Sequence, residues 1–110
     1  MSTPAEPSIA AAMEALWKKF LPQMEERVTA LEAANQALAA ELLSPDQRSE
    51  ASAAAHKLAG VLGTFGLAEG TNLAREAEGI YAGPTEIGPE RLGRLGAIAS
   101  QLRNVITSRK

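Results

Sequence analysis

The spacing of apolar residues predicts helices along most of the chain. From Ile9 onward, apolar residues recur every three or four positions, which is the period of an amphipathic helix. Pro22 interrupts the first stretch, and the residue before a proline is biased away from helix. We therefore expect either a short helix followed by a long one, or one kinked helix. The apolar positions of this region are Ile9, Met13, Leu16, Trp17, Phe20, Met24, Val28, Leu31, Leu38 and Leu42.

Helix-capping residues mark the limits of the next predicted helix. Ser44 is a good N-cap, Pro45 suits the first helical position, and Gln47 completes a capping box. The apolar pattern then continues to about Thr64. Gly66 follows and can take the left-handed conformation that commonly ends a helix. These residues predict a helix from Pro45 to about Thr64.

Two further helices follow in the second half of the chain. One is predicted from about Ala68 to Tyr81, and the other begins at Pro89 after a loop over residues 83–88. Residues 1–7 carry two prolines and small polar residues, so we expect them to form a disordered tail. Residues 8–110 are then left as a single helical domain.

Composition supports an all-α fold. The 110 residues include 22 alanines and 13 leucines, whereas the β-branched residues that favour strands are scarce. Four substantial helices with short connections predict an antiparallel four-helix bundle, with an additional short N-terminal helix covering one end. We expect a monomer, because the apolar stripes of all the helices can be used inside one bundle.

Charge and residue usage exclude several classes of function. The chain has 13 acidic and 11 basic residues, so it lacks the positive charge that nucleic-acid binding needs. It has no cysteine and one histidine, which argues against a protein-borne metal site. It has no membrane-length apolar run and no signal-peptide pattern, so we expect a cytoplasmic protein that binds neither nucleic acid nor membrane.

The single histidine lies on an unusual helix face. At about 100° per residue, His56 points away from the apolar stripe of the predicted 45–64 helix. Its neighbours on this face are small and include Gly60 and Gly63, each of which costs about 1 kcal/mol of helix stability relative to alanine. The usual reason to keep such glycines is close approach by another backbone or molecule. We expect these residues to form a docking platform for a partner: Ser52, Ala53, Ala59, Gly60, Gly63 and Thr64.

An exposed neutral imidazole is a good nucleophile. The sequence shows no second catalytic group that would make His56 the base of a hydrolase. Acceptance and return of a phosphoryl group is the chemistry that fits best, because a partner can supply the metal and acidic residues. Lys57, about 100° away around the helix, is predicted to help screen the phosphoryl charge.

Residues 55–67 and 73–78 also carry a family resemblance. An exposed histidine, an apolar residue two positions later, a glycine four positions later and a glycine-bounded turn resemble the histidine-containing phosphotransfer (HPt) domain of bacterial two-component phosphorelays. His56, Leu58, Gly60, Gly66 and Leu73 match this pattern. Many members carry a lysine three residues after the histidine, where this chain has Ala59 and so departs from the family.

The resemblance implies a function and partners. Nε2 of His56 would accept a phosphoryl group from the phospho-aspartate of a response-regulator receiver domain and pass it to another receiver. The partners would also include a hybrid or sensor histidine kinase. The chain would bind no cofactor itself, and Mg²⁺ would lie in the partner receiver domain. We expect a phosphoryl carrier without ATP-dependent kinase activity, and the Met1 start favours a free-standing protein.

Two alternatives belong to other functional classes. The chain could be a non-catalytic module that docks receivers, or a helical adaptor that dimerises through Gly60 and Gly63, and in both His56 is not phosphorylated. Glu76 and Glu78 are predicted to lie on a solvated helix, and nothing in the sequence supports paired-carboxylate catalysis by them. The sequence leaves open the donor, the acceptor and the direction of phosphoryl flow.

Overall fold

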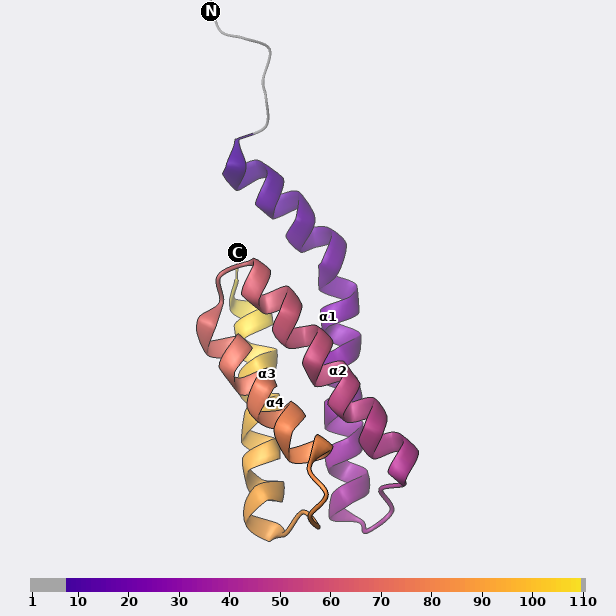
Figure 1. Cartoon of the computed structure of the whole chain (residues 1–110). Coiled ribbons are helices and arrows are strands. Elements are labelled where there is room, and N and C mark those ends of the chain that lie inside the picture. The colour runs from indigo at the N-terminus through magenta and orange to yellow at the C-terminus, as the bar shows by residue number, and fades with distance from the viewer. Residues whose placement is uncertain (1–7, 110) are drawn as a thin grey trace, which may run out of the picture.

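The computed structural model describes residues 8–109 as four helices that run alternately up and down (Figure 1). The helices are α1 (Ile9–Ala39), α2 (Pro45–Thr64), α3 (Ala68–Ala82) and α4 (Pro89–Ser108). Each helix packs against two others, in the cyclic order α1, α2, α3, α4. The predicted all-α antiparallel bundle is confirmed. The predicted tail over residues 1–7 lies outside the described part of the chain.

The start and end of α2 agree with the predicted capping signals. The Ser44 hydroxyl accepts a hydrogen bond of 3.0 Å from the backbone N–H of Gln47. At the other end, Gly66 has φ +69°, and the N–H of Leu67 donates to the carbonyl of Leu62 at 3.0 Å. This is the glycine-centred cap that closes a helix, and it sets the direction in which α3 leaves.

Of the two alternatives for the first stretch, the structure has the single helix and no separate short N-terminal helix within residues 8–109, because α1 runs through Pro22 without interruption. A proline removes one backbone hydrogen bond and tends to kink the helix. Buried Trp17 and Met24 on either side of Pro22 hold both halves of α1 against the bundle. Figure 1 shows α1 bent along its length, with its first turns extending beyond the ends of the other helices.

Three of the apolar positions predicted to face inward do not do so. α1 ends at Ala39, and Glu41 takes a left-handed conformation with φ 60°, so Leu42 leaves the helical register and is 76% exposed. Ile9 and Leu16 are exposed as well, because they lie in the first turns of α1. Helical periodicity shows which residues share a face, but it does not show where the neighbouring helices end.

Small side chains let α2 and α3 approach each other closely. Ala55 and Ala59 of α2, and Ala74 and Ala77 of α3, are all buried in the core. On Gly70 of α3, a Cβ atom would lie 3.0 Å from the Leu62 side chain, which is closer than ordinary packing allows. The backbones of these two helices therefore lie near each other along the part of α2 that carries the histidine.

Arg48, near the start of α2, holds the end of α3 and the following loop. Its guanidinium donates hydrogen bonds to the backbone carbonyls of Ile80, Tyr81, Gly83 and Thr85. These carbonyls lie at the C-terminal end of a helix and just beyond it, where backbone acceptors lack helical partners. A planar guanidinium suits this arrangement because it carries several donors in a fixed fork.

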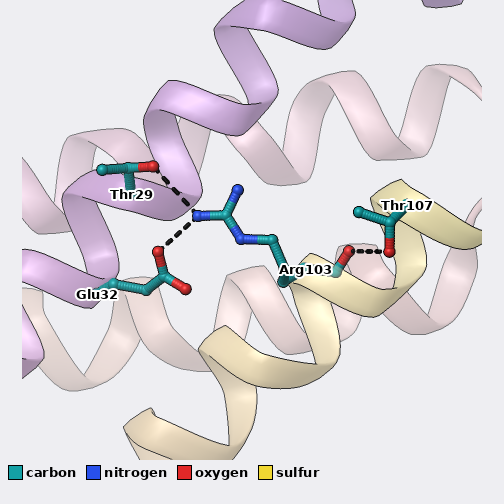
Figure 2. Close-up of polar contacts among 4 residues, drawn as sticks. All are labelled: Thr29, Glu32, Arg103 and Thr107. Carbon is teal, nitrogen blue, oxygen red and sulfur yellow. Dashed lines mark hydrogen bonds and ion pairs between the residues drawn. The ribbon is translucent and has the colours of Figure 1, made fainter.

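A polar contact joins α4 to α1. The Arg103 guanidinium donates to the Thr29 hydroxyl at 3.1 Å and to the Glu32 carboxylate at 2.5 Å. Figure 2 shows both contacts. The same close-up shows the Thr107 hydroxyl donating to the Arg103 backbone carbonyl, one turn earlier in α4.

Over residues 8–109, none of the helices has the length and apolar character needed to cross a membrane.

Candidate functional site

The candidate site is centred on His56, in the middle of α2. Its side chain is 73% exposed, as predicted from its place opposite the apolar stripe. Ala55 and Leu58, on the inner side of the helix, are fully buried and anchor this part of α2. The imidazole is therefore carried by a rigid element and accessible to another molecule.

Glu78 of α3 forms a hydrogen bond with one of the two ring nitrogens of His56. Its Oε2 atom lies 2.8 Å from Nδ1 of His56, and its side chain is 31% exposed. This contact depends on the small residues between α2 and α3, which bring the two backbones close enough for a glutamate to reach the ring. The prediction that Glu78 is merely a solvated surface residue is therefore wrong.

The contact with Glu78 determines which nitrogen is available. A carboxylate accepts hydrogen bonds but cannot donate them, so a neutral His56 bonded to Glu78 carries its proton on Nδ1. Its lone pair is then on Nε2, the nitrogen farther from the backbone. The carboxylate also orients the ring, because the hydrogen bond to Nδ1 fixes its rotation.

A hollow of about 260 Å³ lies beside the imidazole. It is lined by His56, Ala59 and Gly60 from α2 and by Arg75 and Glu78 from α3. On Gly60, an added Cβ atom would meet nothing within 4 Å, so packing inside the chain does not require this glycine. The exposed side chain of Arg75 brings a positive charge to the hollow.

The predicted docking residues differ in their accessibility. Ala53, Gly60, Gly63 and Thr64 are exposed on the same helix as His56, and Lys57 is exposed beside it. Ser52 is half-buried, because its hydroxyl donates to the backbone carbonyl of Glu78 at 3.3 Å.

The prediction that Ala59 belongs to the exposed face is wrong. Ala59 is 3% exposed and belongs to the core, since α3 packs over that edge of α2. The helical wheel placed Ala59 about 60° from His56, and the position of α3 decided on which side of the boundary it falls.

Sequence reasoning missed both Glu78 and Arg75. On a helical wheel, Glu78 lies about 40° from buried Ala74 and so flanks the buried stripe of α3, whereas Arg75 lies about 100° from Ala74. Glu76 lies at the other edge of the stripe, about 60° from buried Leu73. A search for polar residues at the edges of the α3 stripe would have found Glu78 first, but the sequence did not show which helix faces that edge.

Glu76 is engaged elsewhere and does not belong to the site. Both of its carboxylate oxygens accept hydrogen bonds from Arg94 of α4, at 2.5 and 2.7 Å. The hydrogen bond from Arg94 lowers the pKa of Glu76, and the same pairing raises the pKa of Arg94.

Within residues 8–109, no three His, Cys, Asp or Glu side chains gather so as to hold a metal ion.

The chain is similar to known proteins along most of its length. Residues 15–105 match the family model described as "Hpt domain". The chain is also similar to Protein RcaC of Microchaete diplosiphon, with 29% identity over 96 residues. The match covers 87% of this chain but 15% of that relative, so the chain spans a small part of its length. No solved structure shows a significant match to the chain.

Proposed function

The chain belongs to the Hpt domain family, whose role is phosphotransfer in two-component relays, and from this premise we propose that His56 is its phosphoryl carrier. In this proposal, Nε2 of His56 accepts a phosphoryl group from the phospho-aspartate of one receiver domain and passes it to another. The observation that carries the proposal is the contact of Glu78 with Nδ1, which leaves Nε2 as the exposed nucleophile.

The transfer can be written with all atoms and charges balanced. The Nε2 lone pair attacks phosphorus, the N–P bond forms, and the P–O bond to the aspartate breaks. The aspartate leaves as a carboxylate, and the proton stays on Nδ1, so the phosphorylated ring is positively charged. The Glu78 carboxylate 2.8 Å away stabilises that charge. In the reverse direction, the same proton makes the ring a neutral leaving group.

The partner supplies the rest of the chemistry in this proposal. A receiver domain would bring the phosphorylated aspartate and the Mg²⁺ that neutralises the phosphoryl oxygens. Exposed Gly60 and Gly63 allow its surface to close over His56, and Ala53 and Thr64 extend the contact. A sensor or hybrid kinase would be the ultimate source of the phosphoryl group in this relay.

The test is phosphotransfer from a panel of phosphorylated receiver domains to the native chain and to the His56→Gln variant. We expect rapid, acid-labile labelling of the native chain and none of the variant, with circular dichroism showing that both are folded. Receiver binding without labelling would instead make the chain a docking module. Absence of both binding and labelling across the panel would contradict the proposal and leave only a shared fold.

A further inference from the structure

We propose that Arg75 of α3 is a phosphoryl-binding residue of this site, and that its guanidinium contacts the phosphoryl oxygens when His56 carries the group. This inference deepens the proposed function and rests on it. It starts from the hollow beside the imidazole, in which Arg75 and His56 line the same space. The hollow thus places a cationic side chain from a second helix next to the nucleophile.

The charges around the hollow create a need for this cation. A phosphoryl group on Nε2 brings a charge of about −1.5 to −2. The Glu78 carboxylate already lies in the same hollow, so the phosphoryl group arrives beside a negative charge. Without a nearby cation, the carboxylate that favours the attacking nitrogen would also repel the group being transferred.

Arg75 is available for this role, unlike other arginines of the bundle. Arg94 is paired with Glu76, and Arg103 is paired with Glu32. Among the contacts within residues 8–109, no hydrogen bond or ion pair holds the Arg75 guanidinium, and the residue is exposed. Its long side chain can therefore turn toward the phosphoryl group without breaking a structural contact. Guanidinium groups suit this task because they bind phosphate oxygens with two parallel hydrogen bonds.

Ala59 of α2 also lines the hollow, but it cannot bind the phosphoryl oxygens. Its side chain is a methyl group and is buried against α3. Lys57 is the competing cation on α2, and it is exposed one residue from His56. Lys57 does not line the hollow, because it lies about 100° around the helix from His56. Arg75 is thus the basic residue that the fold places at the phosphoryl position.

A partner-free experiment tests the assignment. Phosphoramidate, a small chemical donor, labels histidine as its P–N bond breaks, the Nε2–P bond forms and ammonia leaves. The chain is used without a histidine tag, and His56→Gln sets the baseline. We expect Arg75→Gln to be labelled about tenfold more slowly at low ionic strength, with the difference shrinking in high salt because screening weakens the attraction. Arg75→Lys should recover most of the rate.

Two matched variants and one spectroscopic readout separate this role from a structural one. Arg91→Gln removes an exposed arginine of α4 and should behave as the native chain, while Lys57→Gln should have a smaller effect than Arg75→Gln. In ³¹P NMR, the phosphoryl group of phospho-His56 should titrate at higher pH in Arg75→Gln, since a nearby cation favours the dianion.

The outcomes distinguish the two proposals. Equal labelling rates and equal ³¹P titrations for the native chain and Arg75→Gln would overturn the assignment, as would a tenfold loss found in Lys57→Gln instead. Either result leaves the carrier role of His56 intact when receivers still label it. Labelling by phosphoramidate but by no receiver would contradict the proposed function, while the Arg75 assignment is still judged by its own variants.

Discussion

The Oε2 atom of Glu78 lies 2.8 Å from Nδ1 of His56, although the two residues are 22 positions apart in the chain. One residue comes from α2 and the other from α3, and alanines between the helices allow the contact. In the neutral ring, the carboxylate holds the proton on the inner nitrogen and leaves the lone pair on the outer nitrogen. This pairing makes an exposed surface histidine chemically distinct from an ordinary one.

Replacement of Glu78 should slow phosphorylation of His56 without unfolding the chain. We expect Glu78→Ala to lower the transfer rate roughly tenfold, the equivalent of about 1.4 kcal/mol and typical of a hydrogen bond to a charged group. The transfer rate of Glu78→Gln should lie between those of the native chain and Glu78→Ala, because the amide oxygen still accepts the hydrogen bond but carries no charge. The measurement is the rate of transfer from a phosphorylated receiver.

Glu76→Gln is the matched control for the Glu78 variants. It removes a carboxylate from the same helix, two residues away, where the partner is Arg94 instead of His56. Its transfer rate should equal that of the native chain. A comparable loss in both variants would mean that the total charge of α3 matters, and that the contact with Nδ1 does not.

Substitutions at Gly60 should separate stability from docking. Because an added Cβ atom meets nothing within 4 Å, Gly60→Ala should raise the free energy of unfolding by about 0.5–1 kcal/mol, the helix propensity of alanine over glycine. Gly60→Leu should weaken receiver binding about tenfold, since a bulky side chain obstructs close approach, an effect of about 1.4 kcal/mol.

Gly93 of α4 provides the control for Gly60. It is also exposed, and its added Cβ atom would likewise meet nothing within 4 Å. Gly93→Ala should stabilise the chain by a similar amount, and Gly93→Leu should leave receiver binding unchanged. Urea unfolding and titration calorimetry measure the two effects. Normal receiver affinity in Gly60→Leu would show that the docking surface lies elsewhere.

Arg48 should contribute more to stability than other arginines of the chain. Arg48→Ala leaves several backbone carbonyls at the end of α3 without their donor, which should cost about 2–3 kcal/mol of unfolding free energy. Arg48→Lys should recover less than half of the loss, because one ammonium cannot reproduce the guanidinium fork. Arg91→Ala, an exposed α4 residue, should change stability by less than about 0.5 kcal/mol.

Tyr81 should make stability depend on pH in the alkaline range. Burial raises the pKa of Tyr81 to about 12, and nearby Arg48 opposes the shift only in part. In the unfolded chain the phenol ionises near pH 10, so between about pH 10 and 12 the folded state holds the proton longer. Stability from this group is therefore complete below about pH 10 and decreases as the pH rises toward 12.

The size of this effect can be isolated with Tyr81→Phe. The stability difference between the native chain and this variant should be constant below about pH 10 and should shrink by roughly 2 kcal/mol by about pH 11.5. Since Tyr81 is the one tyrosine in the sequence, absorbance at the tyrosinate band reports its ionisation directly. Ionisation near pH 10 in the folded chain would contradict the prediction.

The sequence by itself determined the local structure and the exposed position of His56. The cap at Ser44, the left-handed Gly66 and the start at Pro89 depend on residues close together in the chain, and all three hold in the structure. His56 was identifiable for the same reason, because helical periodicity places it opposite the apolar stripe of its own helix. Such features require no knowledge of the neighbouring helices.

The tertiary structure alone decided what surrounds His56. The rotation and closeness of α3 against α2 put Glu78 on Nδ1, put Arg75 at the hollow, and turned Ala59 from a surface residue into a core residue. The continuity of α1 through Pro22 was also a tertiary outcome, because buried contacts on both sides outweigh one lost hydrogen bond. Helical periodicity assigns residues to faces, whereas packing between helices decides which faces meet.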